Sequence, residues 1–220
     1  MRLIIVFMIC SLALANENEF KIIEREGEIF IRHGIENDWR IYQASEMLKE
    51  NDWIQSGANS SAKIERHDGK IFILPENTII EGMELKNYTS SELLLILTSI
   101  EISNIPPQKG KPIAPSGAYI IHGNRPTDSA TIDSVEVNQY LEYEMNGLDA
   151  LCEQSFWAGV ILKIFKLKKF EKMLDHESLE YNLLVAYNKM NLVRRFNEAK
   201  ERFIKKYPNS EYIEQINGLR

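Results

Sequence analysis

Cysteine and histidine are scarce in this chain. Its 220 residues include only two cysteines, Cys10 and Cys152, and four histidines. The cysteines are far apart, and no histidine lies four residues from another, the spacing that places two imidazoles on one helix face. The sequence therefore predicts no metal centre and no bound cofactor. Buried apolar side chains have to hold the fold, and the chain is long enough to supply them.

A long apolar run is also missing from the body of the chain. The most apolar stretch after the N-terminus, residues 93–100, is bracketed by Glu92 and Glu101. It is far shorter than the ~20 residues with which a helix spans a bilayer, so no transmembrane segment is expected. The nucleophile-elbow pattern Gly-x-Ser-x-Gly is absent, and no carboxylate pair is marked out by its setting. We therefore expect a protein that is not an enzyme.

The first fifteen residues have the layout of a secretory signal peptide. Basic Arg2 precedes an apolar run over residues 3–12, and the run is followed by a small-residue cleavage site that ends at Ala15. Two other interpretations are a buried N-terminal helix and a lipid anchor on Cys10, although a bulky residue precedes that cysteine. Cleavage after residue 15 predicts an exported protein, periplasmic or secreted. Cys152 then has no cysteine to pair with.

A β-hairpin is predicted around Asp68-Gly69. Strand-like runs flank this pair, and a two-residue Asp-Gly loop favours a type I′ turn because both residues tolerate positive φ. In that register Ile64 faces Ile73 across the hairpin. Four apolar side chains then share one face: Ala62, Ile64, Ile71 and Ile73. A lone hairpin is marginal in water, so further strands are expected to pack with it.

The pattern of turns and apolar residues divides the remaining chain. Short strands with frequent turn signals fill residues 20–104, which predicts an all-β sandwich whose last strands lie at residues 78–85 and 93–102. Residues 105–137 carry five prolines and are interpreted as a semi-rigid linker. From residue 138 to 220 the apolar period is helical, with tight turns between helices. The predicted fold class is α+β.

The β-rich half, from Gly27 to about residue 80, resembles the FecR-domain family. The order and spacing of eight positions carry the resemblance. They are Gly27, Trp39, Asp52, Asn59, Asp68, Gly69, Pro75 and Asn77. Asn51 stands where the family usually has a glycine before the aspartate. The resemblance implies an exported β-rich module that works through protein contacts, here without the cytoplasmic and transmembrane segments of the family's sensors.

The C-terminal half looks like a tetratricopeptide helical hairpin. The resemblance is carried by the tail Ala199-x-x-x-Phe203-x-x-x-Tyr207-Pro208, and by Tyr181 and Tyr187 in the helix before it. Only one repeat is clear, whereas free-standing arrays normally need three or more. The resemblance implies helices that bind a partner protein. The candidate contact residues are Tyr181, Tyr187, Phe203 and Tyr207.

Three further features admit more than one interpretation. The lysines between residues 163 and 172 could attract an anionic partner or a membrane surface, but a solvated helix face is the preferred interpretation. Trp39 and Trp53 could form a ligand platform, although tryptophans in strands are more often core residues. The polar run over residues 56–61, close to Trp53, is expected to be exposed.

These patterns together predict a non-enzymatic binding or scaffold protein of the bacterial cell envelope. Its partners are expected to be envelope proteins, contacted through the FecR-like half and the helical repeat. The alternative is an accessory protein that binds peptidoglycan or another carbohydrate through the β-rich half. No nucleic-acid partner is expected for a chain with a net charge of −6.

Overall fold

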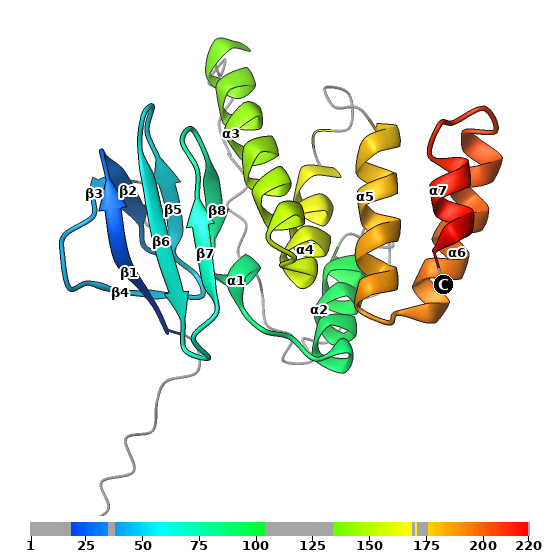
Figure 1. Ribbon diagram of the computed structural model, residues 1–220, viewed down its shortest axis with the longest axis horizontal. Coiled ribbons are helices and arrows are strands. Elements are labelled where there is room, and N and C mark those ends of the chain that lie inside the picture. Colours follow the sequence, from blue (N-terminus) through cyan, green and yellow to red (C-terminus); the bar gives the residue numbers. More distant parts are fainter. Residues whose placement is uncertain (1–18, 35–37, 104–133, 169, 171–175, 220) are drawn as a thin grey trace, which may run out of the picture.

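The computed structural model describes residues 19–34, 38–103, 134–168, 170 and 176–219 (Figure 1). The predicted signal peptide, residues 1–15, and most of the predicted linker lie outside the described residues. The N-terminal half contains two antiparallel sheets, and the C-terminal half contains helices. The prediction of a mixed α+β fold is therefore confirmed.

Eight strands form the two sheets. In chain order they are β1 (Glu19–Glu26), β2 (Ile29–Arg32), β3 (Arg40–Ile41), β4 (Met47–Lys49), β5 (Trp53–Ser56), β6 (Ser61–Arg66), β7 (Ile71–Leu74) and β8 (Ile79–Glu81). The first sheet has the order β4-β1-β6-β7, and the second sheet has the order β3-β2-β5-β8. The chain therefore changes sheets five times, and only the pairs β2–β3 and β6–β7 follow one another within the same sheet.

Each sheet buries one face in a shared core. Strand β6 shows the two-residue period of a strand, with Ala62 and Ile64 buried while Lys63 and Glu65 are partly exposed. Both sheets contribute to the core: Phe20, Ile22, Ile64, Phe72 and Leu74 from the first sheet, and Ile29, Ile31, Ile54 and Ile80 from the second.

The hairpin of β6 and β7 forms where it was expected, but the predicted register is wrong by one residue. Ile64 faces Phe72 rather than Ile73. The predicted apolar face of β7 is wrong for the same reason, because a shift of one residue turns every side chain of a strand to the other face. Phe72 and Leu74 point into the core, whereas Ile71 and Ile73 are 44% and 51% exposed.

The length of the hairpin loop explains this shift. The backbone N–H of Arg66 donates to the carbonyl of Lys70 at 2.9 Å, so the loop contains three residues instead of two. Only Gly69 within the loop has positive φ, at 81°. A turn that ends in one left-handed glycine is typical of three-residue hairpin loops, so the predicted type I′ turn is also wrong.

Two expected strands are partly or wholly helical. The strand predicted at residues 78–85 ends at Glu81, and helix α1 (Gly82–Leu85) follows at once. The strand predicted at residues 93–102 is helix α2 (Ser90–Ser103). A reciprocal cap starts α2, because the Glu92 N–H donates to the Thr89 hydroxyl at 3.2 Å and the Thr89 N–H donates to the Glu92 carboxylate at 2.8 Å.

The C-terminal half is helical, as its apolar period predicts. The helices are α3 (Ser134–Glu153), α4 (Trp157–Leu167), α5 (His176–Lys189), α6 (Val193–Lys206) and α7 (Ile213–Gly218). Figure 1 shows α3 and α4 beside the sheets, α5 beyond them, and α6 and α7 farthest from the sheets. Within the part of the chain that the structure describes, none of the helices combines the length and apolarity needed to cross a membrane.

Helices α3 and α4 approach the backbone of β8 and α1 so closely that glycine is required at two contact points. A Cβ atom built on Gly147 of α3 would lie 2.3 Å from the Ile79 carbonyl oxygen. One built on Gly159 of α4 would lie 2.0 Å from the Glu84 carbonyl oxygen. One set of buried apolar residues therefore continues from the sheets into the helices. The predicted domain boundaries at residues 104 and 138 stay predictions.

Candidate functional site

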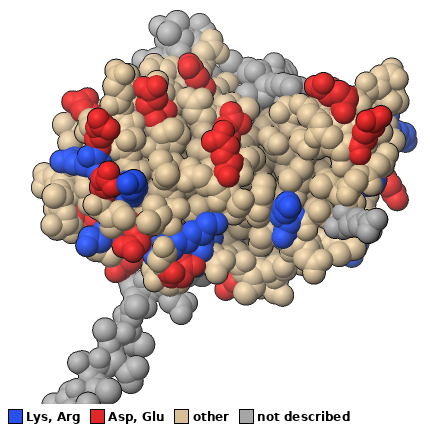
Figure 2. Space-filling view, in the orientation of Figure 1, with Lys and Arg blue, Asp and Glu red and all other residues tan. Residues whose placement is uncertain are grey.

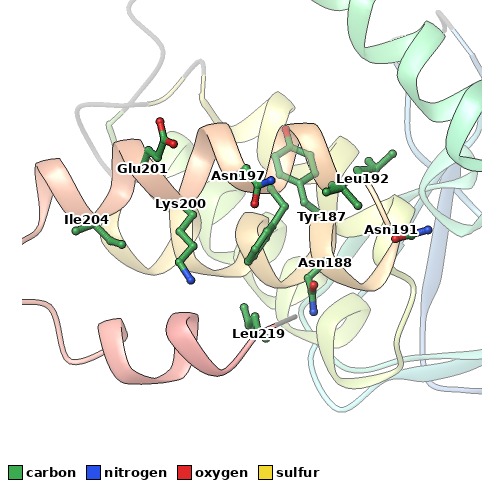
Figure 3. A pocket seen from close by; sticks show the side chains of 11 residues that line it. Tyr187, Asn188, Asn191, Leu192, Asn197, Lys200, Glu201, Ile204 and Leu219 are labelled. Atoms are coloured by element: carbon green, nitrogen blue, oxygen red, sulfur yellow. The ribbon is translucent and has the colours of Figure 1, made fainter.

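A groove of about 530 Å³ lies at the far end of the helical half (Figure 3). Helices α5 and α6 and the segment after α7 form its walls. Eleven side chains line it: Tyr187, Asn188, Asn191, Leu192, Val193, Phe196, Asn197, Lys200, Glu201, Ile204 and Leu219. Much of one wall comes from a single face of α6, because Val193, Asn197 and Ile204 recur at helical spacing.

The groove combines an apolar floor with polar and aliphatic groups at its rim. Leu192 and Phe196 are buried, whereas Val193 is 59% exposed. Three asparagine amides offer both donors and acceptors. The Lys200 ammonium donates to the Ile216 carbonyl at 3.2 Å, which ties α6 to α7, and Figure 3 shows its side chain extending toward α7. Such a lining suits a peptide segment that has aliphatic side chains and a polar backbone.

The four predicted partner-contact residues serve mainly in helix packing. Tyr187 lines the groove but is only 2% exposed, and Phe203 is fully buried. Tyr207 packs on the Phe203 ring at 5.0 Å between centroids. Tyr181 stacks on Tyr212 with ring centroids 4.2 Å apart. Sequence reasoning missed the asparagines and Lys200, although the polar residues that recur along one face of α6 were a signal.

The positions from which a FecR resemblance was predicted lie mainly in turns of the β-rich half. Gly27 has φ of 70°, and a Cβ there would lie 2.3 Å from the Ser60 hydroxyl oxygen. Asn59 and Asn77 have φ of 53° and 50°. These conformations favour glycine and asparagine, which explains the residue types without a ligand.

The turns at residues 57–60 and 75–78 are tied together. The Asn59 N–H donates to the Glu76 carboxylate at 2.7 Å, and the Asn77 N–H donates to the Gly57 carbonyl at 3.2 Å. Ser56 donates to the carbonyl of Pro75. Ser56 and Ser60 are buried, so the prediction of an exposed polar run over residues 56–61 is wrong at both serines.

Two further motif residues lie in the hairpin loop and in a charged cluster. Asp68 accepts hydrogen bonds from the Arg66 guanidinium, which holds the pKa of the Asp68 carboxyl at about 2. Buried Asp52 contacts His33, with 2.8 Å between its Oδ1 and the imidazole Nδ1. The other ring nitrogen of His33 lies 3.0 Å from Glu46. Carboxylates therefore occupy both nitrogens of this histidine, and neither is left for a substrate.

The faces of Trp39 and Trp53 carry cations of the protein itself. The Arg32 guanidinium lies 5.0 Å from the centre of the Trp39 ring and 4.8 Å from that of Trp53. The Lys166 ammonium lies 3.9 Å from the Trp53 ring. Both indoles are partly exposed. These internal cation–π contacts compete with any ligand that would stack on the two rings.

A buried square of ion pairs joins the helices to the β-rich half. Lys163 of α4 lies 2.8 Å from Glu84 of α1 and 2.7 Å from Glu144 of α3. Lys166 lies 3.4 Å and 2.9 Å from the same two carboxylates. Lys163, Glu84 and Glu144 are almost entirely buried. The preferred interpretation of the lysine run as a solvated face is therefore wrong for Lys163.

The charges on the face shown in Figure 2 do not by themselves mark a binding site. Figure 2 shows acidic and basic side chains dispersed over the face in view, with wide uncharged areas between them. Within the described residues, no group of three or more histidine, cysteine, aspartate or glutamate side chains is arranged to hold a metal ion.

No protein-family model matches the chain, and neither curated proteins nor solved structures give a significant match.

Proposed function

We propose that this protein is a non-enzymatic scaffold of the bacterial cell envelope that binds a partner protein through the α5–α6 groove. The groove is the observation that carries the proposal. The export and the envelope location rest on the signal-peptide pattern and on the resemblances to the FecR-domain and tetratricopeptide families. The partner segment is a peptide that offers aliphatic side chains to Val193 and Ile204 and backbone groups to the asparagine amides.

The β-rich half holds the groove in a fixed position in this proposal. Its contacts with α3 and α4 include the buried ion pairs and the close approach of Gly147 and Gly159 to backbone carbonyls. Helix α2 then connects to the groove end. The Ser90 hydroxyl donates to the Met190 carbonyl at 2.9 Å, and Arg195 pairs with Glu101 at 2.5 Å. Because these contacts hold α5 and α6 in place before a partner binds, less conformational entropy is lost on binding.

Capture of partners by the full chain tests the groove. Val193→Glu with Ile204→Glu places two charges at its rim, on side chains that are 59% and 36% exposed, so the fold should tolerate the change. Leu95→Glu is the control for an added surface charge, because Leu95 does not line the groove and is 73% exposed. Envelope proteins captured by the wild type and by the control should be lost from the groove variant. Equal recovery of the same proteins by the groove variant would sink the proposal.

A second candidate is the binding of peptidoglycan or another carbohydrate. One observation favours it, an open polar depression of about 500 Å³ between the β7–β8 turn and α3. Its lining is rich in amides and includes one phenol: Asn77, Asn138, Gln139, Glu142 and Tyr143. Sedimentation with purified sacculi separates the candidates. Binding that is lost in Tyr143→Ala and kept in the groove variant favours this candidate, and no binding above a control protein removes it.

A further inference from the structure

Arg32 of β2 is held between two tryptophans on the outward face of the second sheet. In the antiparallel register it lies directly across from Trp53 of β5, and Trp39 directly precedes β3 on the other side of β2. Ile29 and Ile31 alternate with it and are buried in the core, so the Arg32 side chain points outward. The two indoles, whose ring centres lie 5.0 Å and 4.8 Å from the guanidinium, therefore fix a cation on the outside of the sheet.

The guanidinium of Arg32 has no anionic partner. Within the residues that the structure describes, no carboxylate lies at ion-pair distance from it, and its Nε is buried without a hydrogen-bond partner. The indole faces offset part of the positive charge, but they are weak acceptors for the five N–H groups of a guanidinium. Only Nε is both buried and unpartnered, so the two terminal amino groups are the ones that a ligand reaches.

Carboxylates close to this guanidinium in the chain or in the sheet are engaged elsewhere or stay apart from it. Glu46 and Asp52 both contact His33. Glu81 accepts from the backbone of the first turn of α1 and caps that helix. Asp38 is exposed and lies outside ion-pair distance of the guanidinium. The described part of the chain therefore leaves this cation without a counter-charge.

The neighbouring cations are already neutralised. Lys166, which lies over the Trp53 ring, pairs with both carboxylates of the buried square, and Arg40 pairs with Glu46. One free positive charge remains, that of Arg32. A partner group with a single negative charge matches it better than a phosphate, whose charge approaches −2 at neutral pH. The charge balance therefore favours a carboxylate.

The surroundings of this free cation are apolar. Phe30 lies two residues before it on the same face of β2 and faces Ile41 of β3, which is 55% exposed. Both indoles are partly exposed as well. Arginine and tryptophan are enriched among the residues that contribute most to protein interfaces, where less critical contacts around them exclude water. Such a setting suits a carboxylate carried by an apolar segment of a protein.

We propose that Arg32, flanked by Trp39 and Trp53, anchors a second protein-binding surface that receives a glutamate or aspartate side chain of a partner. Its two terminal amino groups donate in parallel to the two carboxylate oxygens. The indoles hold the guanidinium in place beforehand, which lowers the entropy lost on binding. Phe30 and Ile41 contact the aliphatic neighbours of the acidic residue. This surface and the α5–α6 groove lie at opposite ends of the molecule, so neither proposal depends on the other (Figure 1).

Peptide titrations of the full chain test this surface. The probe is acetyl-Ala-Leu-Glu-Leu-Ala-amide, whose only charge is the glutamate carboxylate, and its comparators are the glutamine peptide, the phosphoserine peptide and acetate. The indole N–H signals of Trp39 and Trp53 in ¹⁵N NMR spectra report binding, and that of Trp157 in α4 is the internal reference. Both reporters should shift with a dissociation constant on the order of 1 mM. The glutamine peptide should bind at least about tenfold more weakly.

Variants assign the response to the arginine. Arg32→Gln should abolish it, and Arg32→Lys should weaken it about tenfold, because lysine keeps the charge but lacks the paired donors. Lys21→Gln removes one charge from an exposed position of β1 and should respond like the wild type. The groove variant, Val193→Glu with Ile204→Glu, should also respond like the wild type, so failure of the groove proposal and failure of this one are distinguishable.

Each comparison can overturn the proposal. Equal binding of the glutamate and glutamine peptides, or no shift at about ten times the expected dissociation constant, would exclude a carboxylate-binding surface. An unchanged response in Arg32→Gln would exclude the arginine as its anchor. Acetate binding as tight as that of the peptide would show that the apolar surroundings contribute nothing, and tighter binding of the phosphoserine peptide would contradict a singly charged ligand. If Arg32→Gln does not fold, the peptide comparison on the wild type still decides the question.

Discussion

Gln154, in the turn between α3 and α4, pairs with Ile73 as a neighbouring strand would. Its side-chain oxygen accepts from the Ile73 N–H at 2.6 Å, and its amide nitrogen donates to the Ile73 carbonyl at 2.7 Å. Strand β7 is at the edge of the first sheet, where backbone groups are otherwise open to another strand. One side chain therefore covers this edge at Ile73 and ties the α3–α4 turn to it.

Replacing Gln154 with Glu should destabilise the protein by about 1–2 kcal/mol at neutral pH. The carboxylate can still accept from the Ile73 N–H, but it faces the Ile73 carbonyl without a proton to donate. Below its ordinary pKa of about 4.3 the carboxyl regains a donor, so the difference from the wild type should shrink at pH 3.5. Urea unfolding at both values measures this. Gln43→Glu, at an exposed position, is the control, and an equal loss in both variants would contradict the pairing.

Alanine at Gly147 or Gly159 should destabilise the contact between the helices and the β-rich half by about 1–3 kcal/mol. Alanine favours a helix over glycine by about 1 kcal/mol, but here its methyl group would meet a carbonyl oxygen at 2.3 or 2.0 Å. Gly218→Ala in α7 is the matched control, because no atom lies within 4 Å of the new methyl group. Thermal unfolding should rank both variants below the wild type and leave the control unchanged or slightly more stable. A Gly159→Ala protein as stable as the control would refute the close contact.

Valine at Gly69 should lower stability by about 1–3 kcal/mol, because a β-branched residue is strained at φ of 81°. Space is not the obstacle, since nothing lies within 4 Å of the added Cβ. Gly69→Asn separates strain from other effects, because asparagine tolerates the left-handed region far better than valine. Melting temperatures should follow the order glycine, asparagine, valine. Equal values for the two variants would argue against backbone strain.

His33 should make stability depend on pH near neutrality. Burial alone would lower its pKa, but the hydrogen bonds to Asp52 and Glu46 outweigh this and raise the pKa above 6.5. The contribution of this imidazolium is therefore full below pH 6.5 and is lost as pH rises through the folded-state pKa. The difference in unfolding free energy between the wild type and His33→Asn should shrink over that range. Parallel pH profiles of the wild type and His33→Asn would contradict this role of His33.

The sequence patterns predict strands and helices better than they predict how these elements meet. The alternation in β6 correctly located the central hairpin. An Asp-Gly pair, however, occurs in both two-residue and three-residue loops. The hydrogen bond from the Arg66 N–H to the Lys70 carbonyl shows that this loop has three residues. The apolar run of α2 resembles a buried strand. Only the Thr89–Glu92 cap, which is visible in the sequence, would have marked it as a helix.

The groove and the buried charges could not be predicted in the same way. Lys163 stands in an apolar helix, and whether it meets water or a carboxylate depends on Glu84, far away in the chain. The groove requires α5, α6 and Leu219 to come together, which no local pattern encodes. The aromatic residues of the helical-repeat pattern were visible, but that pattern describes how the helices pack and does not show which side chains remain accessible.

The lysines of the buried square are made long after one of the carboxylates they neutralise. Synthesis runs from the N-terminus, so Glu84 leaves the ribosome before Lys163 and Lys166 exist. Until α4 emerges, the nascent sheets have to keep Glu84 in water, and β7 lacks the side chain that covers its edge at Ile73. Helix α1 therefore cannot reach its final packing until α4 has been made. For a chain exported through its predicted signal peptide, this delay favours a loosely folded state while passage across the membrane is still required.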